Sequence, residues 1–166
     1  KLIRQTLEFS EKNEITLKEE LDYLETYLKL EQERFENKFT FNIRLPQDFE
    51  DGNFYLPPLI LQPIIENAVR HGVRGRNDKA GLIEIEAQNY NGCVLISIKD
   101  NGPGIKHSQQ SATAASLSHH SMGMRLVEER IKVFNDFGEK KIVMQADEVY
   151  TSGPYHGTFV KIEIPV

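Results

Sequence analysis

A polar stripe on a predicted helix is the first feature of this chain that could carry out chemistry. Residues 64–72 read Ile-Ile-Glu-Asn-Ala-Val-Arg-His-Gly, and helical spacing places the apolar and polar residues on opposite sides. The polar side carries a carboxylate, a carboxamide and two potential cations, namely Glu66, Asn67, Arg70 and His71. This combination suits a hard metal ion and phosphate oxygens, although such stripes are usually only solvated faces. The helix is predicted to end at Gly72.

A second candidate site follows a strand-like run and reads Asp-Asn-Gly-Pro-Gly-Ile over residues 100–105. Asp100 at a strand end could accept a hydrogen bond from the exocyclic amine of adenine. Gly102 and Gly104 would let the backbone approach a flat ligand. The alternative is an ordinary turn, for which Asn-Gly-Pro-Gly is also a typical sequence. The motif alone leaves both interpretations open.

Two further groups of residues carry a weaker chemical signal. Residues 121–124 precede a predicted helix, so their backbone amides could receive phosphate oxygens, or Ser121 could simply cap the helix. His107, His119 and His120 resemble metal ligands by residue type. Because their segment lacks a fixed geometry, we expect no zinc site there.

Size and composition predict a single domain and exclude several classes of protein. The 166 residues are 39% hydrophobic, which is enough for a buried core. The net charge of −5 argues against nucleic-acid binding through a broad basic surface. Cys93 is interpreted as a core thiol in a reducing compartment, and no apolar run approaches the ~18 residues of a membrane span. Because the chain starts at Lys1 in apparent mid-helix, we expect it to be a fragment.

Two helices are predicted before the first strand. Residues 1–12 are typical of the end of an amphipathic helix. Thr16 and Glu19 then form a capping-box pattern for a second helix, which is predicted to reach about Asn37. Its apolar stripe has near-heptad spacing and comprises Leu17, Leu21, Leu24, Leu28 and Phe35. The pattern fits a core helix and a connector or dimer-forming arm equally well.

The next elements would position the first candidate site. Alternating hydrophobic residues predict a half-buried strand over residues 39–45. Pro57 and Pro58 are predicted to open the helix that carries the polar stripe, with Pro63 either early within it or at a kink.

A β-hairpin would position the second candidate site. Two alternating runs, residues 83–88 and 94–99, are joined by an Asn91–Gly92 turn, so the hairpin would deliver Asp100 at its end. A mobile loop over residues 106–121, a helix over residues 123–137 and strands near residues 142–144 and 160–164 complete the order. This order predicts an α+β sandwich in which helices cover one face of a mixed sheet.

The motifs, taken together, resemble those of a known superfamily. Residues 66–72 and 100–105, Gly123 before a helix, and Gly157 with Thr158 are similar to the N, G1, G2 and closing motifs of the Bergerat-fold ATPases. That superfamily includes sensor histidine kinases, gyrase, Hsp90 and MutL.

Two more stretches, residues 27–35 and 56–63, are similar in particular to the LytS-like sensor histidine kinases. The resemblance covers roughly the whole chain and implies a two-layer α/β sandwich with an N-terminal helical segment. Residues 1–38 would be the end of a dimerisation and phosphoacceptor region with a connector helix, and residues 39–166 an ATP-binding catalytic domain.

The resemblance also implies a role for each site residue. Asn67 would coordinate the Mg²⁺ that bridges the ATP phosphates, and Glu66 would be the neighbouring acid that assists phosphoryl transfer. Asp100 would bind the adenine amino group directly and through a water shared with Thr158. The remaining cofactor-binding residues would be Arg70 and His71 on the phosphate side, Gly102, Gly104 and Ile105 at the adenine, and Met122, Gly123 and Met124 at a helix start facing the phosphates. Residues 106–121 would form a lid over ATP.

Three departures from the family pattern bear on activity. Ser121 stands where the family usually has glycine, and Leu126 stands where a polar residue is common. The family's phosphoacceptor histidine lies upstream near a Pro-His-Phe motif, and none of the five histidines here matches it.

The function that the resemblance implies is that of a catalytic domain of a sensor histidine kinase. It would transfer the ATP γ-phosphate to an upstream histidine, for relay to the receiver domain of a response regulator. The full-length kinase would be a homodimer that binds no nucleic acid and is attached to a membrane only through missing upstream segments, and this domain would lie on the cytoplasmic side. The alternatives are a nucleotide-binding interaction module without kinase activity, or another Bergerat-fold ATPase that drives a clamp or chaperone cycle.

Overall fold

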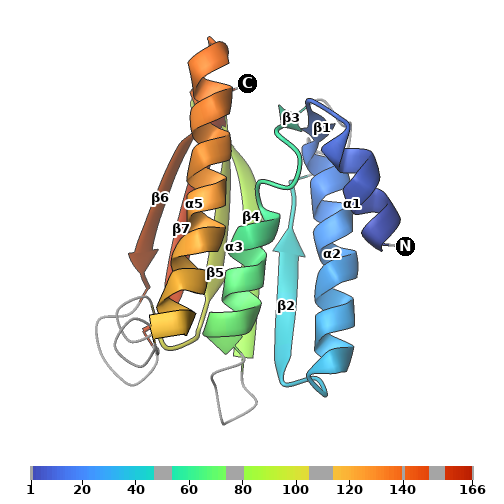
Figure 1. Ribbon diagram of the computed structural model, residues 1–166, viewed down its shortest axis with the longest axis vertical. Helices are drawn as coiled ribbons and strands as arrows, with labels where there is room; N and C mark the ends of the chain where they lie inside the picture. Colours follow the sequence, from blue (N-terminus) through green and yellow to red (C-terminus); the bar gives the residue numbers. More distant parts are fainter. Residues whose placement is uncertain are drawn as a thin grey trace.

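The computed structural model describes residues 2–46, 54–73, 81–104, 114–139, 141–149 and 156–165. These residues form two layers, a β-sheet and a set of helices that cover one of its faces (Figure 1). The predicted α+β class and the two-layer arrangement are confirmed. Within the described ranges, no helix is both long and apolar enough to cross a membrane.

Five strands form the main sheet in the order β2-β4-β5-β7-β6. Their bounds are Phe39–Arg44 (β2), Gly81–Tyr90 (β4), Cys93–Asp100 (β5), Val143–Glu148 (β6) and Thr158–Pro165 (β7). Strand β2 runs parallel to β4, and every other neighbouring pair is antiparallel. The sheet is therefore mixed, as predicted, with its parallel pair at one edge.

Alternation of side chains along the strands gives the sheet one buried face. The buried residues on this face are Ile83, Ile85 and Ala87 in β4, Val94, Ile96 and Ile98 in β5, and Val160, Ile162 and Ile164 in β7. The register aligns Ile85, Ile98 and Val160 across three neighbouring strands. The opposite face carries charged pairs such as Lys161 and Glu163.

The predicted hairpin between β4 and β5 is confirmed in detail. Asn91 and Gly92 both have a left-handed backbone, with φ values of 49° and 77°, which is the conformation that a tight two-residue hairpin turn requires. The resulting register pairs Ile83 with Asp100. Asp100 is therefore placed at the end of the hairpin, as the sequence predicted.

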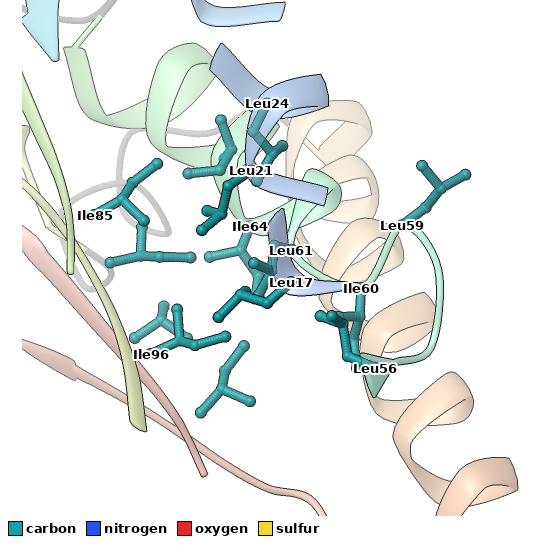
Figure 2. Packing of buried hydrophobic residues seen from close by; sticks show 14 of the residues in the cluster. Leu17, Leu21, Leu24, Leu56, Leu59, Ile60, Leu61, Ile64, Ile85 and Ile96 are labelled. Atoms are coloured by element: carbon teal, nitrogen blue, oxygen red, sulfur yellow. The ribbon is translucent and has the colours of Figure 1, made fainter. Parts of the chain in front are cut away.

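The helical layer is formed by α1 (Leu2–Ser10), α2 (Leu17–Arg34), α3 (Gln62–Asn67), a π-helical turn η2 (Ala68–Val73) and α5 (Ala114–Phe137). Helix α3 packs against α5, and η2 packs against β4 and β5. Figure 2 shows Leu17 and Leu21 of α2 next to Leu61 and Ile64, with the sheet residues Ile85 and Ile96 facing this cluster. The core therefore lies between the sheet and helices α2, α3 and α5.

A second, two-stranded sheet was not predicted. It pairs β1 (Ile15–Thr16) with β3 (Tyr55–Leu56) in antiparallel orientation, and it buries Ile15 and Leu56. Two-residue strands are too short to produce a recognisable alternation, because at least about four residues are needed to establish a period of two.

Helix α2 begins as predicted and ends earlier than predicted. Thr16 and Glu19 form the full capping box. The helix ends at Arg34 rather than Asn37, because Glu36 and Asn37 have left-handed φ values of 52° and 55° that an α-helix cannot continue.

Two predicted boundaries of the site helices were wrong. Pro57 and Pro58 do not open α3, which begins at Gln62, whereas Pro63 lies in its first turn as one of the two predicted alternatives. The α-helix ends at Asn67 and continues as the π-helical turn η2 to Val73, one residue beyond the predicted end at Gly72.

Helix α5 begins at Ala114, so residues 114–121 are helical and not part of a loop. Ala114 and Ala115 are the strongest helix-forming residue type, and an internal glycine such as Gly123 costs only about 1 kcal/mol. The rest of the predicted loop, residues 106–113, lies outside the described residues.

Candidate functional site

Helix α3 and η2 carry the first group of predicted site residues. Glu66 and Asn67 are half-buried and Arg70 is exposed, whereas Ile64, Ile65, Ala68 and Val69 are buried against the sheet and α5. His71 belongs to the same turn, and its side chain lies outside the described part of the structure.

The helix changes type directly after Asn67. A π-helix has a wider turn than an α-helix, so Arg70 and His71 do not follow Glu66 and Asn67 at α-helical spacing. The sequence pattern did not predict this change, because hydrophobic periodicity cannot distinguish a single wide turn from a regular one. Such turns are common at functional sites.

Glu66 is fixed by a neighbour one turn earlier on α3. The Nε2 atom of Gln62 donates a hydrogen bond of 2.7 Å to Oε1 of Glu66. Tyr27 of α2 feels the charges of this site. Burial raises the pKa of its hydroxyl, and the carboxylates of Glu31 and Glu66 raise it further. Arg70 opposes this shift in the pKa of Tyr27. Tyr27 therefore lies beside Glu66 and Arg70 and was not predicted as part of the site.

Asn67 has a polar atom without a partner. Its Nδ2 is buried and has no hydrogen bond, one of two such buried side-chain atoms in the described part of the chain. A buried donor without a partner costs about 1–3 kcal/mol, so its retention calls for an explanation. A phosphate oxygen would satisfy Nδ2, while the amide oxygen of the same side chain is a ligand type that Mg²⁺ accepts. The residues present at this position therefore fit a phosphate with its metal ion.

Asp100 is a buried carboxylate at the junction of two strands. Only 6% of the residue is exposed, and its Oδ1 accepts a 2.8 Å hydrogen bond from the backbone N–H of Gly102. Thr158 lies directly opposite Asp100 in the register and donates hydrogen bonds from its hydroxyl and its backbone N–H. Burial raises the pKa of Asp100 to about 6, and these hydrogen bonds oppose the rise. Asp100 and Thr158 are thus brought together, as the resemblance implied.

The turn after Asp100 packs so closely on the start of β7 that side chains cannot fit. Gly104 has a φ of 88°, and a Cβ atom there would lie 2.6 Å from the Cβ of His156. Gly157 has a φ of 64°, and its Cβ would lie 2.5 Å from the carbonyl oxygen of Asp100. The N–H of Gly157 also donates a 2.8 Å hydrogen bond to the carbonyl of Gly102. The glycines therefore let the backbone around Asp100 pack closely on the start of β7.

Asn101 fixes the other side of this turn and was not predicted as a site residue. Its Oδ1 accepts a 2.8 Å hydrogen bond from the backbone N–H of Leu82, and its own N–H donates to the carbonyl of Leu82 at 3.2 Å. Asn101 thus ties the turn to β4. An asparagine directly after a strand is a common turn residue, so its sequence signal could not be separated from the background.

The two groups of residues lie at the same end of the molecule. The end of β5, the start of β7, the end of η2 and the start of α5 are all at the lower end in Figure 1. Asp100 and the junction of α3 and η2, at Asn67, therefore lie at the same end of the sheet.

The remaining predicted residues lie within α5 or outside the described residues. Met122 and Gly123 lie inside α5 and not at its start, and their side chains are outside the described part. Met124 is half-buried against the core, and Ile105 lies outside the described residues. Among the residues that the structure describes, no three His, Cys, Asp or Glu side chains cluster around a possible metal position.

Comparisons with known proteins agree on one family. Residues 57–166 match the family described as histidine kinase-, DNA gyrase B-, and HSP90-like ATPase, and residues 1–39 match the histidine kinase family. The chain is 35% identical over 106 residues to the sensor protein LytS of Staphylococcus epidermidis, covering 64% of this chain and 17% of that protein. It is 34% identical over 118 residues to the sensor histidine kinase BtsS of Escherichia coli, covering 71% and 19%.

A solved structure supports the same architecture. The histidine kinase AdeS of Acinetobacter baumannii is similar with a TM-score of 0.58 at 17% identity, over 99% of this chain and 75% of that one. At this identity the likeness concerns the fold. The chain spans less than a fifth of the length of LytS or BtsS.

Proposed function

Because the chain belongs to the family of histidine kinase-, DNA gyrase B- and HSP90-like ATPases, we propose that it is the ATP-binding catalytic domain of a two-component sensor histidine kinase. The observation that carries this proposal is the buried Asp100 carboxylate, held opposite Thr158 at a turn that has no room for side chains. A buried acceptor beside a closely packed glycine turn suits a flat base with an amino group.

Asp100 would select adenine by its charge. The exocyclic amine of adenine would donate a hydrogen bond to the carboxylate, whereas guanine would present a carbonyl oxygen at the corresponding position and repel it. Sites that bind a polar group in a buried pocket discriminate strongly against a ligand that leaves the pocket group unpaired. Gly102, Gly104 and Ile105 would shape this adenine pocket, and Thr158 would support Asp100.

The phosphate side would be formed by the turn at Asn67. The amide oxygen of Asn67 would bind Mg²⁺, its unpaired Nδ2 would donate to a phosphate oxygen, and Arg70 and His71 would add positive charge. Bound Mg²⁺ supplies charge neutralisation of the phosphates. Glu66 would be the acid next to the transferred group, and Met122, Gly123 and Met124 would line the phosphate side of α5.

In the full-length protein, the γ-phosphate would pass to a histidine upstream of residue 1 and then to an aspartate of a response regulator receiver domain. The kinase would act as a homodimer, with this domain on the cytoplasmic side where ATP is found. The similarity of residues 1–39 to the histidine kinase family supports this assignment, as do the names of LytS and BtsS.

The site assignment is tested by calorimetric titration of this chain with a non-hydrolysable ATP analogue, with and without Mg²⁺. Asp100→Asn and Asn67→Ala are expected to weaken binding by roughly 10–100-fold, because the first removes the negative charge that would receive the adenine amine and the second removes the amide that would bind Mg²⁺ and phosphate. Asp136→Asn and Asn42→Ala are matched controls at exposed positions of α5 and β2 and are expected to bind as the wild type does. Unchanged affinity in both site variants would contradict the assignment.

A second candidate function is a nucleotide-binding interaction module without kinase activity. Leu126, which stands where relatives commonly have a polar residue, is 49% exposed on α5, so an apolar side chain faces solvent there. Incubation of the full-length protein with labelled ATP separates the two functions. A phosphorylated histidine supports the kinase, and saturable ATP binding without phosphorylation supports the interaction module.

A further inference from the structure

Glu20 of α2 is a fully buried carboxylate that lies outside the nucleotide site. Its Oε2 accepts a 2.8 Å hydrogen bond from the backbone N–H of Leu59, and its Oε1 accepts a 3.0 Å hydrogen bond from the N–H of Leu61. Both partners belong to the turn that leads into α3, which lies about forty residues further along the chain. Glu20 therefore joins the second helix directly to the start of the helix that carries Glu66 and Asn67.

Arg130 of α5 holds the same turn from the other side. Its guanidinium donates hydrogen bonds to the carbonyl oxygens of Pro58, at 2.8 Å, and Leu59, at 3.1 Å. The turn thus offers its N–H groups to α2 and its carbonyl groups to α5. The positive charge of Arg130 also lowers the pKa of Glu20, although burial is the larger influence and raises that pKa to about 7.

Leu59 at the centre of this turn has a backbone conformation that needs support. Its φ is +57°, in the left-handed region that a leucine rarely adopts. Glu20 binds its N–H and Arg130 binds its carbonyl, so both polar groups of the strained residue are held by side chains from different helices. Residues in such conformations persist where the surrounding contacts fix them.

The turn helps to set where α3 points, because it leads directly into the first residues of α3. Leu61 at its N-cap makes no side-chain capping bond, and the carboxylate of Glu20 instead binds the backbone N–H of Leu61. The α-helical part is only six residues long, and Asn67 lies about 9 Å along the axis from Leu61. A small displacement of the turn would therefore be transmitted to Glu66 and Asn67.

We propose that Glu20 and Arg130 are positioning residues for the nucleotide site, which hold residues 58–61 so that α3 presents Glu66 and Asn67 to the phosphates. The inference rests on the proposed function. Beyond that function, it states that the position of α2 affects the phosphate half of the site, at Glu66 and Asn67. The adenine half, at Asp100 and Thr158, does not depend on α2.

Two ligands separate the halves of the site. Adenosine reports on Asp100 and Thr158, and Mg·ADP reports in addition on Asn67. Binding to this chain is measured at pH 8, where Glu20 is ionised, by NMR titration of the wild type and Glu20→Gln. The variant keeps the shape of the side chain but loses one of its two acceptors. We expect Mg·ADP affinity to fall by roughly tenfold, because Glu66 and Asn67 would no longer be oriented toward the phosphates. Adenosine affinity should stay within about twofold, because adenosine does not reach these residues.

Arg130→Gln and Arg130→Lys provide a second pair of variants at an exposed side chain, in case Glu20→Gln does not fold. Arg130→Gln is expected to weaken Mg·ADP selectively, and Arg130→Lys, which keeps a charged donor, to recover most of the loss. Val94→Ala, a buried position of β5 that belongs to none of the helices α2, α3 and α5, controls for general destabilisation and should change neither affinity.

A selective loss of Mg·ADP binding in Glu20→Gln or Arg130→Gln supports the proposal. Equal losses for both ligands, or no loss for either, would overturn it, since Glu20 and Arg130 would then serve stability alone. Failure of the wild-type chain to bind adenosine would overturn the proposed nucleotide site itself, and this inference with it.

Discussion

Two acidic side chains, Glu20 and Asp100, are the buried charged residues in the described part of the chain, and they lie in different surroundings. Glu20 uses both oxygens to bind backbone N–H groups of one turn. Asp100 accepts from Gly102 and Thr158 at the end of β5, where a glycine turn packs on the start of β7. Asp100 keeps 6% of its surface exposed whereas Glu20 keeps none, so Asp100 is the one suited to receive a further donor from a ligand. This difference is why we assign binding to Asp100 and positioning to Glu20.

The protonation of Asp100 gives a prediction about stability and pH. Burial raises its pKa from 3.8 to about 6 in the folded chain, so the folded state binds a proton more tightly than the unfolded state. The stabilisation from the protonated form is complete below about pH 4 and is lost as pH rises through about 6. A shift of about two pKa units corresponds to roughly 3 kcal/mol.

Urea unfolding of the wild type and Asp100→Asn at several values between pH 4 and pH 7 measures this loss. The free energy of unfolding of the wild type should fall by up to about 3 kcal/mol relative to the variant over this range. Saturating adenosine should reduce the effect, because a donor to the carboxylate lowers the pKa of Asp100. Parallel pH profiles for the two proteins would show that Asp100 has no raised pKa.

At the scale of single elements, α2 depends on its first turn. Glu19 donates its backbone N–H to Oγ1 of Thr16 at 3.1 Å, and the N–H of Thr16 donates to Oε2 of Glu19 at 2.8 Å. The bond from the Thr16 backbone is the main reason that the pKa of Glu19 is lowered. The same Thr16 lies in β1, so this cap also fixes the point at which the small sheet meets α2.

Thr16→Ala is expected to reduce the free energy of unfolding by about 1 kcal/mol, because the N–H of Glu19 loses its acceptor. Thr26→Ala is the matched control within the same helix. The hydroxyl of Thr26 donates only to the carbonyl of Asp22, so its loss should cost less than about 0.5 kcal/mol. Urea denaturation of the two variants gives the comparison. Equal losses of unfolding free energy would indicate that the Thr16 cap stabilises the chain no more than the helical threonine Thr26 does.

Elements with local signals were predictable, and elements fixed by distant contacts were not. The capping box of α2 and the Asn91–Gly92 hairpin depend on neighbours within a few residues, and both are confirmed. The start of α3 was predicted at Pro57 and Pro58, because proline marks a helix start and also a turn before one. In the structure the two prolines lie in the turn before α3. This turn is held by Glu20 of α2, which accepts a hydrogen bond from the backbone N–H of Leu61.

The candidate site follows the same division. Asp100 was predictable from its position at a strand end, and the structure adds the Thr158 pairing, which needs β5 and β7 to be neighbours in the sheet. The role of Glu20 could not be predicted from the sequence, since its burial depends on residues about forty positions away. The π-helical turn after Asn67 leaves no mark on hydrophobic spacing, so the offset of Arg70 could not be predicted.

At the scale of the whole molecule, the N-terminal helical segment and the sheet share one hydrophobic core. Leu21, Leu24 and Leu28 of α2 belong to the same buried cluster as Ile85 and Ile96 of the sheet. The division of the chain at residue 38 remains a prediction about roles in the full-length protein. The packing gives no reason for the two parts to fold separately, because α2 covers apolar surface that the sheet would otherwise expose.

This shared core predicts that the chain unfolds in one cooperative transition. Leu24→Ala in α2 and Ile96→Ala in β5 each remove a side chain that is fully buried, and each should reduce the free energy of unfolding by about 2–5 kcal/mol. Circular dichroism and NMR signals of strand residues should lose structure at the same urea concentration in each variant. Val133→Ala, at a position that is 58% exposed on α5, is the control and should change stability by no more than about 0.5 kcal/mol. If Leu24→Ala instead melted the helical signal before the strand signals, α2 would be a separately folding arm, and its control over α3 through Glu20 would fail in the same experiment.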